Sequence, residues 1–191
     1  MSGKRSSIAS GGVEAVAEPQ QPAIPLPATI RYASVNFRFG SAWFIAPFRT
    51  HVGDMVVVEY PGTASLHMGL VAAITTEKPE TFYTEENMHP NYLSEEEILT
   101  LPRLLRHARD FDKQTKLDLR QSDLRSLENA QTLAAELQAP ITFLDAEWLL
   151  DFSAITFLVD VYGDVEAVDQ LADELAVQEG AEVVFTFPTI Y

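Results

Sequence analysis

The sequence predicts an α+β fold: a small antiparallel β-barrel or β-sheet, followed by a layer ordered helix, strand, strand, helix, strand. Three observations predict it. Short segments rich in β-branched and aromatic residues, separated by glycine-bearing turns, fill residues 29–76. Apolar residues recur at helical spacing after Asp110 and again after Gly163. Between and after those two stretches, alternation of apolar and polar residues predicts strands.

The composition is that of a folded, acidic protein. The 191 residues are 47% hydrophobic and include 28 acidic and 13 basic residues, which give a formal net charge of -15. This charge opposes non-specific attraction to nucleic acid or anionic lipid and favours basic partners. The chain has no cysteine, which excludes disulfides, thiolate metal sites and cysteine nucleophiles and fits a cytoplasmic protein. A polar beginning and the lack of a long apolar run predict neither secretion nor membrane insertion.

One domain is expected over residues 29–187, with a β subdomain at 29–76 and an α+β subdomain at 94–187. Residues 1–28 are small, polar and proline-bearing, so we expect a disordered or extended tail. The strands expected in the β subdomain are TIRYASVNF, SAWFIAPF, DMVVVEY and HMGLVAAIT.

One long amphipathic helix is expected after Asp110 and before Pro140. Its apolar positions are Leu117, Leu124, Leu127, Ala130, Leu133, Ala134 and Leu137. ITFLDAEWLL and AITFLVDVY then predict a hairpin with a tight turn at residues 151–153. Asp164 is the expected N-cap of the last helix, Gly180 its stop, and AEVVFTF the last strand.

A basic stripe is the first candidate site. It comprises six residues in steps of three or four, a spacing that places them on one face of an unbroken helix, or on two helices if the chain breaks near Asp110. They are Arg103, Arg106, Arg109, Lys113, Lys116 and Arg120. Three interpretations stay open: a solvated face that pairs with its own acids, such as Asp112, a contact for a protein partner, or a grip on nucleic-acid phosphates.

The C-terminal third forms the second candidate site. Residues 126–191 contain 13 acids and neither Lys nor Arg. Four of these acids, which lie on the polar side of the last expected helix, repel one another at their helical spacing. They are Glu166, Asp169, Asp173 and Glu174. A partner that carries Lys or Arg would relieve the repulsion, so this surface is a candidate interface; simple solubility is the alternative.

Motifs for catalysis are absent from the sequence. There is no GxSxG, Walker or GxGxxG motif, and the four histidines are scattered, which is typical of surface or turn residues. Asp145 and Glu147 lie two apart on an expected strand and so share a face, which gives an enzyme that uses them with a divalent ion only weak support. We expect no catalytic residue, metal or cofactor.

From HVGDMVVVEYPGTASLHMGLV onward the chain resembles a known family. Its VGD-hydrophobic-VVE strand entry and the turn after it match Val52, Gly53, Asp54, Gly62 and Gly69. Later motifs match Arg106 to Asp112, Leu144 to Trp148, and the segment that opens with Gly163. The family is the polymerase-suppressor (PSP) C-terminal conserved region, which includes the RicT/YaaT proteins, and the resemblance covers roughly residues 31–187.

The resemblance implies a non-catalytic adaptor or scaffold subunit in a complex that governs RNA processing or mRNA turnover. Direct RNA binding through residues 103–120 is the alternative function. A loss of cations weakens that alternative: arginines that the family carries in its last helix and strand are replaced here by residues such as Asp164 and Gln170 or are absent. The expected partners are therefore other protein subunits with a basic surface, with RNA second and no membrane.

Overall fold

A computed structural model describes residues 30–82, 93 and 95–188. The predicted mixed α+β class is confirmed, with one sheet of five strands, one of three strands and three α-helices in the described part. The expected tail, residues 1–28, lies outside the described residues.

The five-stranded sheet has the order β1-β2-β5-β3-β4, and β4 pairs back onto β1, so the sheet closes on itself. Its strands are β1 (Tyr32–Phe37), β2 (Gly40–Ile45), β3 (Met55–Tyr60), β4 (Ser65–Thr75) and β5 (Arg103–His107). Between β4 and β5 lie a 3₁₀ turn, η1 (Glu80–Phe82), and a short helix, α1 (Glu95–Thr100). We refer to this part as the closed sheet.

Two details of the closed sheet differ from the prediction. Residues 29–76 supply only four of its strands; the fifth, β5, comes from the basic segment that we expected to be helical. The sheet is also not wholly antiparallel, because β2 and β5 pair in parallel, through Ile45 and Arg103. Leu104 of β5 is buried with Val56, Val58 and Phe44 inside the closed sheet, and this packing fixes residues 103–107 as a strand.

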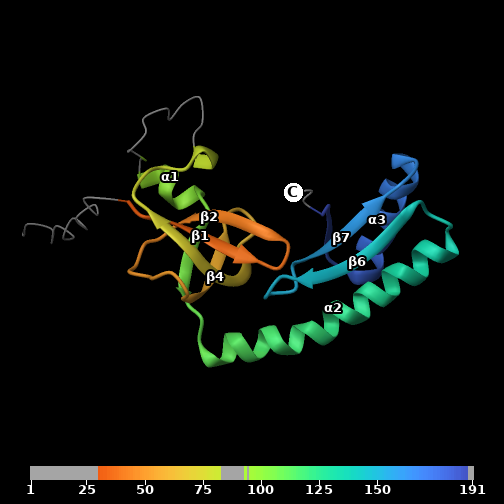
Figure 1. The fold of residues 1–191 in the computed structure, drawn as a ribbon, viewed down its shortest axis with the longest axis horizontal. Helices are drawn as coiled ribbons and strands as arrows, with labels where there is room; N and C mark the ends of the chain where they lie inside the picture. The colour runs from red at the N-terminus through yellow and green to blue at the C-terminus, as the bar shows by residue number, and fades with distance from the viewer. Residues whose placement is uncertain (1–29, 83–92, 94, 189–191) are drawn as a thin grey trace, which may run out of the picture.

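The second part follows the predicted order. It contains α2 (Asp110–Glu136), β6 (Ile141–Trp148), β7 (Ala154–Val161), α3 (Val165–Glu179) and β8 (Glu182–Thr186), and its sheet has the order β6-β7-β8. Asp164 caps α3 by accepting from the amide of Glu166, and Gly180 ends it in the left-handed conformation, both as predicted. In Figure 1, α2 runs beneath both parts of the molecule.

The prediction for the buried side of α2 holds in part. Ala130 and Ala134 are buried, and Leu127 and Leu133 pack against the core, as expected, but other positions differ. Leu117 and Leu124 expose 69% and 49% of their surface, whereas Leu119, Asp123 and Ser126 are buried. The apolar pattern failed here because two polar residues occupy the buried stripe of the helix, where each bonds Trp148 of β6. Asp123 accepts from its backbone amide at 2.8 Å, and Ser126 Oγ from its indole Nε1 at 3.1 Å.

The two parts share a hydrophobic core and are joined by hydrogen bonds. Val57 and Met68, on the outer side of the closed sheet, pack in the same cluster as Leu119 of α2 and Ala146 of β6. Beside this cluster, the β6–β7 turn makes two hydrogen bonds with Leu66 of β4. The amide of Leu150 donates to the carbonyl of Leu66 at 2.9 Å, and the amide of Leu66 donates to Asp151 Oδ2 at 3.1 Å. These contacts fix the position of one sheet against the other.

Candidate functional site

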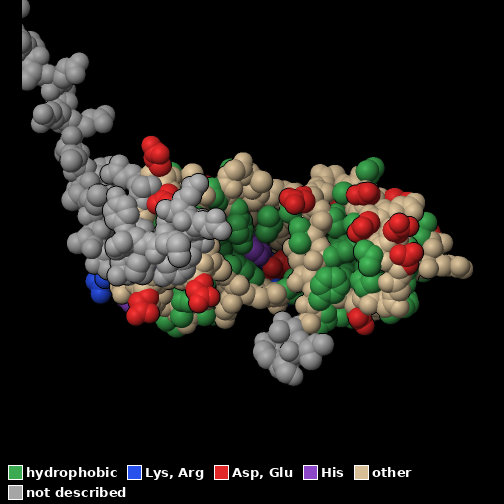
Figure 2. All heavy atoms as spheres, turned by 90° about the horizontal axis from the view of Figure 1, so that it is seen from above, with side chains coloured by type: hydrophobic (Ala, Val, Ile, Leu, Met, Phe, Trp, Pro, Cys, Tyr) green, Lys and Arg blue, Asp and Glu red, His purple; other side chains and the backbone are tan. Residues whose placement is uncertain are grey.

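A groove lies between the closed sheet and the three-stranded sheet, and it is the candidate functional site. Its volume is about 450 Å³. On one wall Glu147, Thr156 and Val184 are neighbours across β6, β7 and β8. The opposite wall consists of the β1–β2 hairpin with residues of β3 and β4. Figure 2 shows this hollow, with a histidine and an acidic side chain at its bottom.

His67 and Glu147 form the base of the groove. His67 Nε2 lies 3.0 Å from Glu147 Oε1, and each side chain exposes only 6% of its surface. The ring of Phe37 stacks on the imidazole with centroids 4.3 Å apart. Nδ1 of His67 is buried and has no hydrogen-bond partner among the described residues. The pair therefore lies at the junction of β4 and β6, screened from water by an aromatic ring.

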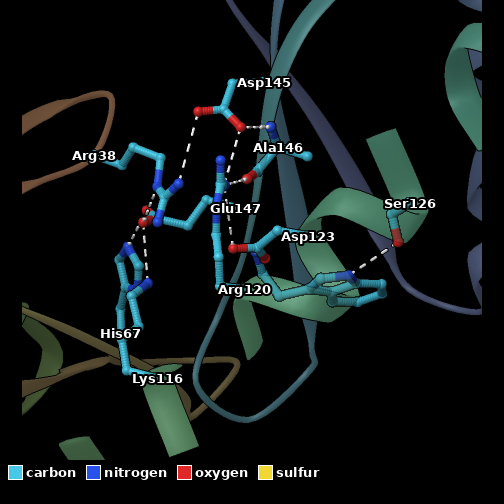
Figure 3. Close-up of polar contacts among 10 residues, drawn as sticks. Arg38, His67, Lys116, Arg120, Asp123, Ser126, Asp145, Ala146 and Glu147 are labelled. Atoms are coloured by element: carbon cyan, nitrogen blue, oxygen red, sulfur yellow. Dashed lines mark hydrogen bonds and ion pairs between the residues drawn. The ribbon is translucent and has the colours of Figure 1, made fainter. Parts of the chain in front are cut away.

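Cations surround this carboxylate and its neighbours (Figure 3). Lys116 Nζ lies 3.0 Å from Glu147 Oε2, and Arg38 Nε lies 3.4 Å from the same oxygen. Arg120 lies 3.0 Å from Asp145 Oδ1 and also hydrogen-bonds to the carbonyl of Ala146. We call Arg38, His67, Lys116, Arg120, Asp123, Asp145 and Glu147 the ionic cluster. It joins the β1–β2 turn, β4, α2 and β6.

The ionic cluster shifts the pKa of Glu147, and Glu147 in turn contributes to the shifted pKa of Tyr60. Burial opposes ionisation of Glu147, but hydrogen bonds from His67 and Lys116 and the positive charge of Lys116 outweigh it and lower the pKa to about 2. A carboxylate with so low a pKa is a weak proton acceptor at neutral pH. Burial, with the charge of Glu147, raises the pKa of Tyr60 to about 12, so this groove residue keeps its phenolic proton. The geometry favours an ion-pair role for Glu147.

Asp145 and Glu147 share a face of β6, as the sequence predicted, and Arg38 contacts both. Their oxygens face Lys and Arg side chains. Within the described ranges, no group of three or more His, Asp or Glu residues is arranged to hold a metal ion. The arrangement thus supplies charge compensation between the two sheets and does not resemble a divalent-ion site.

The basic stripe is wrong as a single helix face. Arg103 and Arg106 lie on strand β5, Arg109 precedes α2, and the other three lie on α2. Four of the six make ion pairs within the chain: besides Lys116 and Arg120, Arg103 binds Glu59 and Arg106 binds Asp112, both at 2.8 Å. Arg109 and Lys113 are exposed. The stripe is divided because β5 completes the closed sheet before the helix begins.

The acidic candidates lie together on α3. Glu166, Asp169 and Asp173 are exposed and Glu174 is half-buried. Asp173 and Glu174 line a second groove, of about 520 Å³, together with Leu133 of α2 and Val177 of α3. We call it the α2–α3 groove. Val177 exposes 85% of its surface. In Figure 2 acidic side chains surround hydrophobic ones on this half of the molecule.

Most of the residues matched to the opening motif of the PSP family lie in the turns that flank β3. Asp54 closes the turn before β3, where its Oδ2 accepts from the amide of His51 at 2.8 Å and from Thr50 Oγ1 at 3.0 Å. Gly53 and Gly62 have φ values of 95° and 89°. Val52 exposes 64% of its surface.

Gly69 and Gly163 are needed for space. A Cβ on Gly69 would lie 2.5 Å from the carbonyl oxygen of Asn36, and one on Gly163 would lie 2.5 Å from Cβ of Pro140. The first position lets β4 pair closely with β1, and the second lets the chain leave β7 beside Pro140.

Three residues in or beside the groove, His67, Arg38 and Tyr60, are not predicted as site residues from the sequence. His67 was expected at the surface or in a turn; that expectation is wrong, because it is buried on β4. Arg38 and Tyr60 carry no local signal either, since each is defined by partners far along the chain. Strand alternation places His67 on the face opposite that of Leu66 and Met68, but it does not indicate that the side chain of Glu147 on β6 reaches it.

No protein-family model, curated protein or solved structure matches this chain. None of the described helices is both long enough and apolar enough to cross a membrane.

Proposed function

We propose that this protein is a non-catalytic adaptor subunit of a protein complex, and that it binds a basic partner through the α2–α3 groove. The observation that carries the proposal is the combination, in one groove, of exposed Val177 with the acidic side chains of Asp173 and Glu174. Exposed apolar surface beside acidic side chains suits an amphipathic helix whose polar side carries Lys or Arg.

The distribution of charge supports the same proposal. Residues 126–191 contain 13 acids and neither Lys nor Arg, so no cation on α3 itself can neutralise its acidic residues. The cations of residues 103–120 are mostly committed elsewhere: Arg103, Arg106, Lys116 and Arg120 each have an acidic partner within the chain. A basic partner would supply what this surface lacks.

Direct RNA binding has less support. Of the six basic residues, only Arg109 and Lys113 are exposed, and Lys116 and Arg120 are directed toward the ionic cluster. Phosphate binding would have to break those ion pairs. The link to RNA processing or turnover therefore enters the proposal through the partner complex, on the strength of the PSP resemblance.

The test compares partners recovered with matched charge variants. Purified protein immobilised at physiological salt is exposed to native lysate, beside the double variant Asp173→Lys, Glu174→Lys and the control Glu128→Lys. Glu128 is exposed on α2 and does not line the α2–α3 groove. We expect a stoichiometric basic protein with the parent and the control, lost from the double variant and at high salt. Equal recovery by all three, or no stoichiometric partner, would contradict the proposal.

A further inference from the structure

The groove between the two sheets is bordered by strand edges. Successive side chains of a strand point to opposite faces, so three consecutive residues can line one groove only where the edge of the strand faces it. Gly40, Ser41 and Ala42 of β2 line it consecutively, and so do Val184, Phe185 and Thr186 of β8. The edges of two strands, one from each sheet, therefore border the same hollow.

Both edges are open in the described part of the chain. β8 pairs only with β7, so its other side has no strand beside it. β2 pairs with β1 along its whole length but meets β5 only at Ile45, which leaves residues 40–44 unpaired on that side. Open edges offer rows of N–H and C=O groups that an extended chain can pair with.

The lining indicates the chemistry of an occupant. Phe37, Phe39 and Tyr60 supply aromatic surface, and the described residues that line the groove include neither Lys nor Arg. Glu147 at the base is compensated by its cations, but Glu182 at the margin is exposed and lies on the C-terminal segment that has no cation. Aromatic faces beside an uncompensated carboxylate favour Lys or Arg over acidic side chains.

We infer that this groove binds an extended peptide segment with basic side chains from a partner protein, which adds as a strand to the open edge of β2 or β8. The inference rests on the proposed adaptor function and adds a second contact, separate from the α2–α3 groove. Main-chain pairing would supply most of the affinity, while Glu182 and the aromatic wall would select Lys or Arg at alternate positions.

The experiment selects peptides from a phage-displayed library of random linear sequences on the purified full-length chain. The best peptide is then synthesised, with and without N-methylation of alternate amides, and its affinity is measured by fluorescence anisotropy. Amide hydrogen exchange at residues 40–44 and 182–186 is followed with and without peptide. Glu182→Lys tests the groove. Glu128→Lys is the matched control, because Glu128 is an exposed acidic residue of α2 that does not line the groove.

We expect enriched sequences to alternate β-branched residues with Lys or Arg, and their binding to slow exchange on one of the two edges. N-methylation in one register should abolish binding, and Glu182→Lys should weaken it by up to about fivefold while Glu128→Lys does not. No enrichment, indifference to N-methylation in either register, or enrichment of acidic sequences would overturn the inference. So would a dimer in sedimentation analysis whose groove amides are already protected, because a second copy would then be the occupant.

The two proposals fail separately. The variant Asp173→Lys, Glu174→Lys should still bind the selected peptide but should no longer recover the partner from lysate. Glu182→Lys should weaken binding of the selected peptide and leave recovery of the lysate partner unchanged. Loss of peptide binding in both variants would indicate one acidic surface acting without strand pairing, and would overturn the strand-addition inference alone.

Discussion

The imidazole of His67 and the carboxylate of Glu147, 3.0 Å apart, connect the closed sheet to the three-stranded sheet. His67 lies on β4 and Glu147 on β6. Lys116 of α2 and Arg38 of the β1–β2 turn approach the same carboxylate. One buried anion thus connects four segments of the chain, and the stability of the junction should depend on it.

Replacing Glu147 with Gln should destabilise the protein strongly. The amide keeps the shape but removes the charge, so Lys116, Arg38 and His67 lose their common partner in a buried site. Breaking a buried pair on one side costs about 3–5 kcal/mol. Urea denaturation measures this loss, and Glu128→Gln, at an exposed position, should change the free energy of unfolding by less than about 0.5 kcal/mol. Equal midpoints for the two variants would show that the ionic cluster is energetically neutral.

The stability should fall with acid in a way that depends on Glu147. Its pKa is lowered from 4.5 to about 2, so its contribution is complete above pH 4.5 and is lost as the pH falls toward 2. The shift corresponds to roughly 3 kcal/mol. Asp112 acts in the same sense, because its hydrogen bond from Arg106 lowers its pKa; Asp123 acts in the opposite sense, because burial raises its pKa.

The measurement is the urea midpoint at several pH values between about 5 and 3. Glu147→Gln should have a shallower slope than the parent, because the substituted amide does not titrate. A parallel slope in parent and variant would assign the acid sensitivity to other carboxylates.

Leu171→Asp should prevent cooperative folding of the second part of the molecule. Leu171 is fully buried between α3 and the three-stranded sheet, and an unpaired carboxylate there costs several kcal/mol against a total stability of roughly 5–15 kcal/mol. Val177, on the same helix, is exposed, so Val177→Asp should leave the thermal midpoint nearly unchanged. Thermal unfolding followed by circular dichroism distinguishes them; a cooperative transition near the parent midpoint for Leu171→Asp would be inconsistent with this packing.

The basic residues should divide into two groups. Neutralising Lys116 and Arg120 to Gln should lower stability by roughly 1–3 kcal/mol, because both pair with partly buried acids. Neutralising the exposed Arg109 and Lys113 should have little effect on folding. Filter retention of a mixed single-stranded RNA pool, at low and physiological salt, completes the test: we expect no salt-sensitive binding by the parent. Retention that disappears with Arg109 and Lys113 would instead favour the phosphate grip.

Gly69→Ala should destabilise the closed sheet by about 1–3 kcal/mol through overpacking. The added methyl group would lie 2.5 Å from the carbonyl oxygen of Asn36 and 2.6 Å from Cγ1 of Val35, so β1 or β4 must shift. Ser41→Ala, at an exposed position of β2, is the control, and urea denaturation compares the two variants. An unchanged midpoint for Gly69→Ala would mean that β1 yields at its register shift between Ser34 and Val35.

Local signals were sufficient for the second part of the fold. Asp164, Gly180 and the turn at residues 151–153 each act within a few residues of themselves, and the elements they delimit occur where predicted. The basic segment has helical spacing of three and four but forms a strand, because Leu104 is buried inside the closed sheet. That burial depends on β2 and β3, which are far away in sequence.

The candidate site was harder to predict for the same reason. Asp145 and Glu147 were recognisable as a pair on one strand face, since that needs only the strand period. Their partners Arg38 and His67 belong to the other sheet, and isolated cations and histidines give no sign of which carboxylate they meet. The apolar positions of α2 were misassigned because Asp123 and Ser126 occupy its buried side to satisfy Trp148.

The position of β5 in the strand order also bears on synthesis. The strands β1 to β4 leave the ribosome first, but the place between β2 and β3 is filled only when residues 103–107 have been made. Until α2 follows, Val57 and Met68 on the outer side of the sheet have no cover either. A nascent chain that stalls before Arg103 would therefore present an open edge on β3 beside a bare apolar surface, a combination prone to aggregation. Translation speed through residues 76–136 should thus influence the yield of folded protein.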